Sequence, residues 1–239
     1  MSQWNTHVSS HGPIEELRPG LWQVTGSLKR SPIPRNMIIW RTPEKGLLIH
    51  SAICLEEEHM KQLDALGDIT HIIVPCEMHR ADVGAYQQRY PKAIVLAPSC
   101  SHEKVNQVVA KCQALEDGLT DWGIKLHRPD GLKDFELHLE IPLEDGSRAL
   151  IMTDALFNLG SSPPTGFGGF MLRLLGSVGP LNITKIGRKL LLRDKESFSN
   201  YIKRLANIPN LSVLSMAHGT CIQHDIQAEL IAASERIRS

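Results

Sequence analysis

The apolar and polar positions of the first half of the chain predict strands that alternate with helices. An Ile/Val-rich run at 70–75 has the uninterrupted apolar character of a buried, parallel strand. The polar segment Thr-Pro-Glu-Lys-Gly joins two other strand-like runs and has the composition of a hairpin turn. The predicted elements are strands at 21–25, 35–41, 46–51, 70–75 and 93–97, and helices near 55–66, 82–90 and 102–115.

The second half begins with a different pattern. Phe135–Ile141 (FELHLEI) alternates strictly between apolar and polar residues, which predicts an antiparallel strand with one solvated face. A continuous apolar run at 148–153 is expected to pair with it. Residues 158–192 are first rich in Gly, Ser and Pro and then apolar and basic in turn, so we expect a loop or helical insertion. The remaining predicted elements are a helix at 195–206, a strand at 211–215 and a helix near 222–237.

Ionisable side chains follow three of these predicted strands. Glu77, His79 and Asp82 come directly after the Ile/Val-rich strand, Asp154 follows LIMT, and His218 follows VLSMA. Open α/β sheets bind their ligands beyond the carboxyl ends of their strands. The five residues are therefore candidates for a metal site or for acid/base chemistry.

The composition is that of an ordinary globular protein. The chain has 239 residues, with 26 Lys and Arg against 26 Asp and Glu, so we expect neither nucleic acid nor a membrane surface as a partner. No apolar run approaches the roughly 18–20 residues of a membrane span, and the N-terminal residues lack the apolar core of a signal peptide. The five cysteines include no C-x-x-C pair, which favours reduced thiols and a cytoplasmic protein.

One stretch departs from this balance of charge. Between residues 171 and 205, eight cations accompany two acids. Such a run forms either a solvated face or the rim of a pocket that accepts anions. The second interpretation favours a small, anionic substrate. The cations are Arg173, Lys185, Arg188, Lys189, Arg193, Lys195, Lys203 and Arg204.

The three strand-end motifs, in this order, resemble those of the metallo-β-lactamase fold superfamily. The segments that carry the resemblance are EMHRAD (77–82), TDALF (153–157) and AHG (217–219). The resemblance implies an α/β (α+β) architecture, a four-layer αββα sandwich with a metal site at one edge of its two sheets. It spans nearly the whole chain, so we expect one domain over residues 1–239.

The metal-binding signature of this superfamily is incomplete here. In the H-x-H-x-D-H motif, His79 occupies the second His position, whereas Glu77 replaces the first His. Ala81 replaces the Asp and Asp82 replaces the last His. The mid-chain His of the family aligns near residues 129–131, which contain none. The chain is similar to a divergent branch of unknown function.

The resemblance implies His79, Asp154 and His218 as metal ligands. Two imidazoles and one carboxylate suit one divalent ion, zinc first, with iron or manganese as alternatives. Glu77 and Asp82 are the candidate catalytic residues. Each of them has three roles open to it: an additional oxygen ligand, a general base, or a partner that orients His79.

These residues support a metal-dependent hydrolase with a mononuclear site. Its substrate would be an ester, a thioester, a lactone or a phosphoester. The alternative is a catalytically inactive protein that binds no metal and uses the scaffold as a ligand-binding or interaction module. An iron-dependent oxidoreductase ranks last, because a di-iron centre would need the missing ligands. Residues 170–192 are expected to pack on their own core, cover the pocket or mediate a homodimer.

Overall fold

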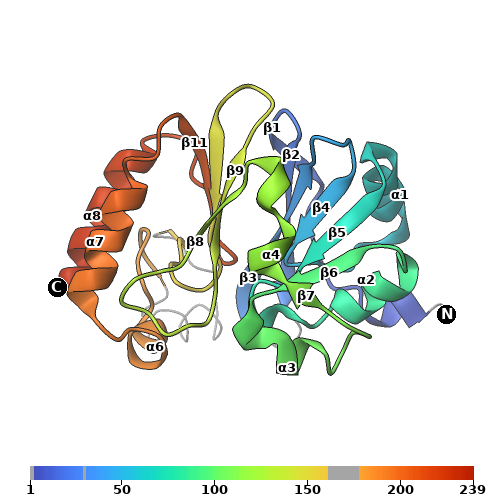
Figure 1. Ribbon diagram of the computed structural model, residues 1–239, viewed down its shortest axis with the longest axis horizontal. Coiled ribbons are helices and arrows are strands. Elements are labelled where there is room, and N and C mark those ends of the chain that lie inside the picture. Colours follow the sequence, from blue (N-terminus) through green and yellow to red (C-terminus); the bar gives the residue numbers. More distant parts are fainter. Residues whose placement is uncertain (1–2, 29–30, 161–177) are drawn as a thin grey trace. The chain divides into compact units, whose positions relative to one another are not determined.

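The computed structural model describes residues 3–28, 31–160 and 178–239 (Figure 1). The chain forms two compact units. Unit 1 comprises Met1–Lys29 and Arg35–Ile124, and unit 2 comprises Lys125–Ser239 with the short stretch Arg30–Pro34. Residues 161–177 of the expected insertion at 158–192 lie outside the described residues. Among residues 3–28, 31–160 and 178–239, no helix has the length and apolarity needed to cross a bilayer.

Unit 1 contains a mixed sheet of seven strands in sequential order. The strands β3 and β4 form the predicted antiparallel hairpin, whereas β4, β5, β6 and β7 are parallel neighbours. The parallel character predicted for the strand at 70–75 is thereby confirmed. The strands are β1 (Glu15–Arg18), β2 (Leu21–Leu28), β3 (Ser31–Arg41), β4 (Leu47–His50), β5 (Ile69–Ile73), β6 (Ile94–Ala97) and β7 (Gln113–Ala114).

Short and long helices join these strands. Met60 and Leu63 of α1 and Tyr86 of α2 are buried in one hydrophobic core with residues of the sheet, such as Ile49 and Ile72. Figure 1 shows α1 and α2 alongside this sheet. The helices are η1 (Gln3–Thr6), α1 (Glu57–Leu66), η2 (Glu77–His79), α2 (Val83–Arg89), η3 (Ser99–Ser101), α3 (His102–Val105), α4 (Leu115–Gly118) and η4 (Thr120–Trp122).

The single helix predicted over 102–115 is wrong. α3 ends at Val105, and the side-chain oxygen of Asn106 accepts a hydrogen bond from the amide of Cys112 at 2.8 Å. Asn side chains compete in this way with the backbone bonds that would continue a helix. The chain turns back as a result, and β7 pairs with β6.

Unit 2 contains a four-stranded sheet in the order β11-β10-β9-β8. β9 and β10 are antiparallel, as predicted, and β10 and β11 are parallel. The helices α7 and α8 run side by side in Figure 1. The elements are β8 (Lys125–His127), β9 (His138–Pro142), β10 (Arg148–Ile151), α6 (Lys185–Leu190), α7 (Lys195–Leu205), β11 (Leu211–Ser215) and α8 (Ile226–Arg238).

The helix α7 buries an apolar stripe at helical spacing. Asp194 caps its first turn by accepting hydrogen bonds from the amides of Glu196 and Ser197. Phe198, Tyr201, Ile202 and Leu205 then recur every three or four residues and pack in the core of unit 2. The predicted helix at 195–206 is confirmed by this element.

The solvated face predicted for 135–141 is wrong. Its polar residues Glu136, His138 and Glu140 are each at most 2% exposed. Their burial is tolerated because each of them has a charged or polar partner. Glu140 forms ion pairs with His127 at 2.9 Å and with Arg148 at 2.8 Å. Alternation alone did not distinguish a solvated face from one filled by such pairs.

Candidate functional site

In unit 2, Asp154 and His218 meet at one edge of the sheet. Asp154 lies in the bend after β10, and His218 follows β11. Because β10 and β11 are parallel neighbours, the segments after them leave the sheet at the same edge. His218 Nε2 lies 3.1 Å from Asp154 Oδ1. Two of the three metal ligands that the sequence resemblance implies are thus in contact.

The other ring nitrogen of His218 is held by the backbone. His218 Nδ1 lies 2.6 Å from the carbonyl oxygen of Pro34, which can only accept a hydrogen bond. Metal-binding histidines commonly donate one ring N–H to a carbonyl in this way and present the second nitrogen to the ion. Two ligands with metal bonds of about 2.0–2.1 Å lie about 3.3 Å apart on a tetrahedral ion. The His218–Asp154 pair thus fits a shared divalent cation in donor type and spacing.

Asp154 also changes the electrostatics of His218. Burial by itself lowers the pKa of His218, but the hydrogen bond and the charge of Asp154, together with the Pro34 carbonyl, outweigh it. The net effect is a raised pKa. The protonated ring would donate to both partners, so a proton and a metal ion compete for Nε2.

The position of His218 depends on Gly219. Gly219 has φ of 104°, and a Cβ atom there would lie 2.1 Å from the carbonyl oxygen of Asn158. This close approach forms a bridge in which Asn158 N–H donates to His218 O at 3.2 Å. The ring of Phe157 packs against His218, with centroids 4.6 Å apart and the two planes tilted by 39°. The AHG and TDALF segments are therefore in contact.

Glu136 holds the segment that carries Asp154. Its Oε2 accepts the N–H of Asp154 at 2.7 Å, and its Oε1 accepts those of Thr153 and Ala155 at 3.2 Å each. A carboxylate that accepts three amide hydrogens fixes the backbone of the turn. Sequence reasoning missed Glu136 because it was assigned to a solvated strand face.

A buried chain of hydrogen bonds continues from Glu136 to α7. Glu136 Oε1 lies 2.8 Å from His138 Nε2, and His138 Nδ1 lies 2.8 Å from the Tyr201 hydroxyl. All the groups are satisfied when Nε2 donates to Glu136 and the hydroxyl donates to Nδ1. Burial, and then the charge of Glu136, raise the pKa of Tyr201, which keeps its hydroxyl protonated. In the sequence, the Glu-x-His spacing was the signal from which these hydrogen bonds could have been predicted.

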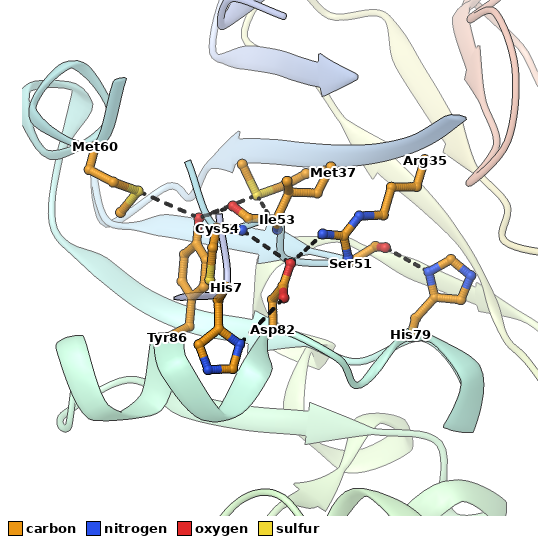
Figure 2. Close-up of polar contacts among 10 residues, drawn as sticks. All are labelled: His7, Arg35, Met37, Ser51, Ile53, Cys54, Met60, His79, Asp82 and Tyr86. Atoms are coloured by element: carbon orange, nitrogen blue, oxygen red, sulfur yellow. Dashed lines mark hydrogen bonds and ion pairs between the residues drawn. The ribbon is translucent and has the colours of Figure 1, made fainter. Parts of the chain in front are cut away.

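In unit 1, His79 is oriented by Ser51 (Figure 2). The Ser51 hydroxyl lies 2.8 Å from His79 Nδ1, and Ser51 follows the end of β4 with φ of 60°. Non-glycine residues in this left-handed region are uncommon and concentrate at functional sites. A ring nitrogen of His79 and the Cys76 sulfur lie within 4.8 Å of each other. Ser51 was not among the predicted site residues.

Asp82 is occupied by a buried ion pair in the same unit (Figure 2). Its Oδ2 accepts hydrogen bonds from Arg35 and from the amide of Cys54, the latter at 3.2 Å. Its Oδ1 lies 3.9 Å from His7 Nδ1. Asp82 thus ties β3 and the segment after β4 to the start of α2. The catalytic role of Asp82 stays a prediction. The ion pair with Arg35 argues for a structural role instead.

Glu77 differs from Asp82 in its surroundings. It is half-buried at the first residue of η2, two positions before His79. The Arg80 guanidinium donates to its main-chain carbonyl at 2.6 Å, which stabilises the turn. Met78, between Glu77 and His79, is 70% exposed. The carboxylate of Glu77 is therefore carried by a short, partly solvated turn.

Two cations of the 171–205 stretch stabilise the C-terminal end of the helix α8. Arg188 donates to the carbonyl of Ile237 at 2.9 Å, and Lys195 donates to that of Arg238 at 2.7 Å. Cations stabilise the C-terminal ends of helices, where the last carbonyls have no partner within the helix. Arg173 lies outside the described residues. The charge of this stretch is thus partly structural.

Comparison with known proteins identifies the fold. No family model matches the sequence, and no curated sequence matches it. The mono-zinc form of the metallo-β-lactamase FIM-1 from Pseudomonas aeruginosa is 11% identical, with a TM-score of 0.59 over 94% of this chain and 96% of that one. DIM-1 metallo-β-lactamase exposed to ceftazidime is 12% identical, with a TM-score of 0.62 over 96% and 98%.

A third solved structure agrees with these two. A metallo-β-lactamase from Erythrobacter litoralis with β-mercaptoethanol in the active site is 14% identical, with a TM-score of 0.57 over 93% of this chain and 96% of that one. Each likeness extends over nearly the full length of both chains. Together they confirm the mixed α/β architecture predicted from the sequence: the chain has the metallo-β-lactamase fold.

Proposed function

We propose that this protein is a metal-dependent hydrolase that uses a single divalent ion. The observation that carries the proposal is the His218–Asp154 pair, whose nitrogen and oxygen lie 3.1 Å apart while the Pro34 carbonyl holds the other ring nitrogen. The fold supports it as well, since one of the similar solved structures is a metallo-β-lactamase in a mono-zinc form. His79 is the third ligand that the sequence resemblance implies.

Zinc is the ion that the donor set favours. Two imidazoles and one carboxylate form a common ligand set for catalytic zinc, and the Cys76 sulfur beside His79 adds a soft donor. Iron and manganese remain the alternatives. When bound, such an ion supplies a Lewis acid that makes water nucleophilic near neutral pH. A second ion is not proposed, because Ala81 and residues 129–131 supply no ligands.

The residues around the ligands divide the remaining work. Ser51 orients His79 through Nδ1, and Glu136 holds the backbone of Asp154. Glu77 is the carboxylate that we propose as general base, because it is carried by a partly solvated turn. Asp82 is assigned a positioning role, since both its oxygens face protein partners.

The substrate is proposed as a small ester, thioester, lactone or phosphoester. The cation excess between residues 171 and 205 supports an anionic molecule within this group. Arg188 and Lys195 contribute less to that preference, because they bind the end of α8. The equal totals of cations and acids give no support for a nucleic-acid substrate.

Metal content and hydrolysis of model substrates test the proposal. Protein purified without chelator should contain at least about one equivalent of zinc by elemental analysis. His218→Ala, Asp154→Asn and His79→Ala should each lower the metal content and the hydrolysis of a panel of nitrophenyl esters, thioesters, lactones and phosphoesters. His224→Ala is the matched control, because His224 is an exposed histidine of unit 2. A wild-type protein that binds no divalent ion would overturn the proposal.

One observation favours the non-catalytic alternative. Both ring nitrogens of His218 already have protein partners, so the pair is also stable as a protonated histidine on a carboxylate. A scaffold of this kind would serve as a ligand-binding or interaction module. Zinc would then raise the thermal stability of the wild-type protein no more than that of an Asp154→Asn/His218→Ala variant, whereas it would stabilise the hydrolase more than this variant.

A further inference from the structure

A second group of donor side chains lies in unit 1, at the start of α1. Ring nitrogens of His11 and His59 and a carboxylate oxygen of Glu56 all lie within 4.8 Å of one another. None of the three belongs to the ligand set proposed for the hydrolase. We propose that His11, Glu56 and His59 form a separate binding site for a borderline transition-metal ion such as Zn²⁺, Ni²⁺ or Cu²⁺.

The backbone around His11 is fixed against β2. His11 forms a bridge with Gly26, and the amide of Gly12 donates to the carbonyl of Thr25 at 2.8 Å. The amide of Ser27 donates to the carbonyl of Ser10, also at 2.8 Å. A ligand on such a segment is held in place before an ion binds, which favours binding.

The hydrogen bonds of His11 define which nitrogen can bind an ion. Nδ1 lies 2.8 Å from the carbonyl oxygen of Gly12, so Nδ1 carries the hydrogen. Nε2 accepts the amide hydrogen of Glu56 at 2.9 Å and therefore carries a lone pair. Metal-binding histidines show the same arrangement, with one ring nitrogen on a backbone carbonyl and the other available to the ion.

His59 supplies a nitrogen that the protein leaves unsatisfied. Its Nδ1 is buried and has no hydrogen-bond partner among the described residues. The rings of His11 and His59 are perpendicular, with centroids 4.8 Å apart. Buried polar atoms of native proteins nearly always have a partner, and an exception calls for an explanation such as an absent ion. Coordination at Nδ1 would satisfy this atom.

Glu56 completes the set through its spacing from His59. Glu56 is the N-cap of α1, and His59 lies three residues later on the same side of its first turn. The Glu56 side chain is exposed and can rotate toward the two rings. The ligand atoms, now within 4.8 Å of one another, need to lie at the roughly 3.3 Å that separates ligands of one tetrahedral ion. Two imidazoles and one carboxylate then leave one position for water.

Two effects oppose binding and limit its strength. The Glu56 amide would lose its bond to His11 Nε2 and turn to water, and the positive end of the helix dipole repels a cation. Glu58 in the first turn of α1 counters that repulsion. The donor set excludes Mg²⁺ and Ca²⁺ as the intended ions, because imidazole is a poor ligand for hard cations.

Calorimetric titration with Zn²⁺ tests the site in a background that lacks two of the three proposed hydrolase ligands. An Asp154→Asn/His218→Ala variant, stripped with chelator, should still bind about one equivalent of zinc and gain thermal stability from it. Adding His59→Ala should weaken this binding at least about tenfold. Adding His224→Ala instead, at an exposed histidine of unit 2, should leave it unchanged.

The results that would overturn the site are equally direct. Either the background variant binds no zinc, or His59→Ala leaves the affinity intact. Because His11 also bonds the start of α1, His11→Ala is used only if circular dichroism shows a native fold, and Glu56→Gln serves as the second variant. Failure of the hydrolase proposal is distinguishable, since the wild-type protein would then bind no more zinc than the background variant.

Discussion

Replacing Glu136 by Gln tests whether a buried carboxylate holds the Asp154 turn. Gln has the same shape, so its oxygen can still accept two of the amide hydrogens, but its NH₂ group would then face the amide of Asp154. The change removes charge-assisted bonds and leaves a buried amide without an acceptor, which costs about 2–4 kcal/mol. For a chain of this size, each 1 kcal/mol lowers the melting temperature by roughly 2–4 °C. We expect a decrease of about 5–15 °C.

Thermal and urea unfolding followed by far-UV circular dichroism measure this change. Glu144→Gln, in the exposed turn between β9 and β10, is the matched control and should alter stability by less than about 0.5 kcal/mol. Tyr201→Phe removes the hydroxyl that reaches His138, and combining it with Glu136→Gln should cost less than the sum of the two changes. A loss below about 1 kcal/mol for Glu136→Gln would refute the reasoning, because it would mean that water or another donor replaces the carboxylate.

Three further changes test the same geometry. Gly219→Ala should destabilise the protein by about 3 kcal/mol in urea unfolding, because its Cβ would lie 2.1 Å from the Asn158 oxygen. Ser51→Gly should be more stable than Ser51→Ala by about 1 kcal/mol, since glycine relieves the positive φ, while calorimetry should show equally weakened zinc binding in both. The raised pKa of His218 means that the Asp154 pair stabilises metal-free protein fully below the unfolded-state pKa of about 6.5. That stability should be lost as pH rises through the folded-state pKa, and Asp154→Asn should flatten the melting profile above about pH 6.5.

The sequence predicted most of the elements because their apolar patterns are strong. The Ile/Val-rich run became β5 between two parallel neighbours, and the helical stripe of α7 and the strand β11 were predicted nearly to the residue. The helix over 102–115 failed for a local reason, the bond between Asn106 and Cys112. That bond joins two residues that are close only once the turn has formed. The spacing of apolar residues in the sequence therefore could not have revealed the end of the helix.

The candidate site was predictable only where a side chain leaves the end of a strand. Asp154 and His218 follow strands that are parallel neighbours, and their side chains lie 3.1 Å apart. Glu136 and Ser51, which hold the turn of Asp154 and the ring of His79, were missed. Glu136 contributes because its face of the predicted strand is buried, and Ser51 contributes because its backbone has a positive φ. Both properties are set by tertiary packing.

The buried polar groups of unit 2 explain why the Asp154 turn needs Glu136. The three amides from Thr153 to Ala155 follow the end of β10, and all three donate to the carboxylate of Glu136. Water would satisfy these amides in an exposed turn, but here the site is buried and a fixed acceptor is required. A carboxylate supplies several lone pairs on one side chain. His138 bonds Oε1 of the same carboxylate, and Tyr201 bonds the second ring nitrogen of His138. The same bonds restrict the Asp154 backbone, so the partner of His218 is positioned by the folding of the core rather than by a ligand.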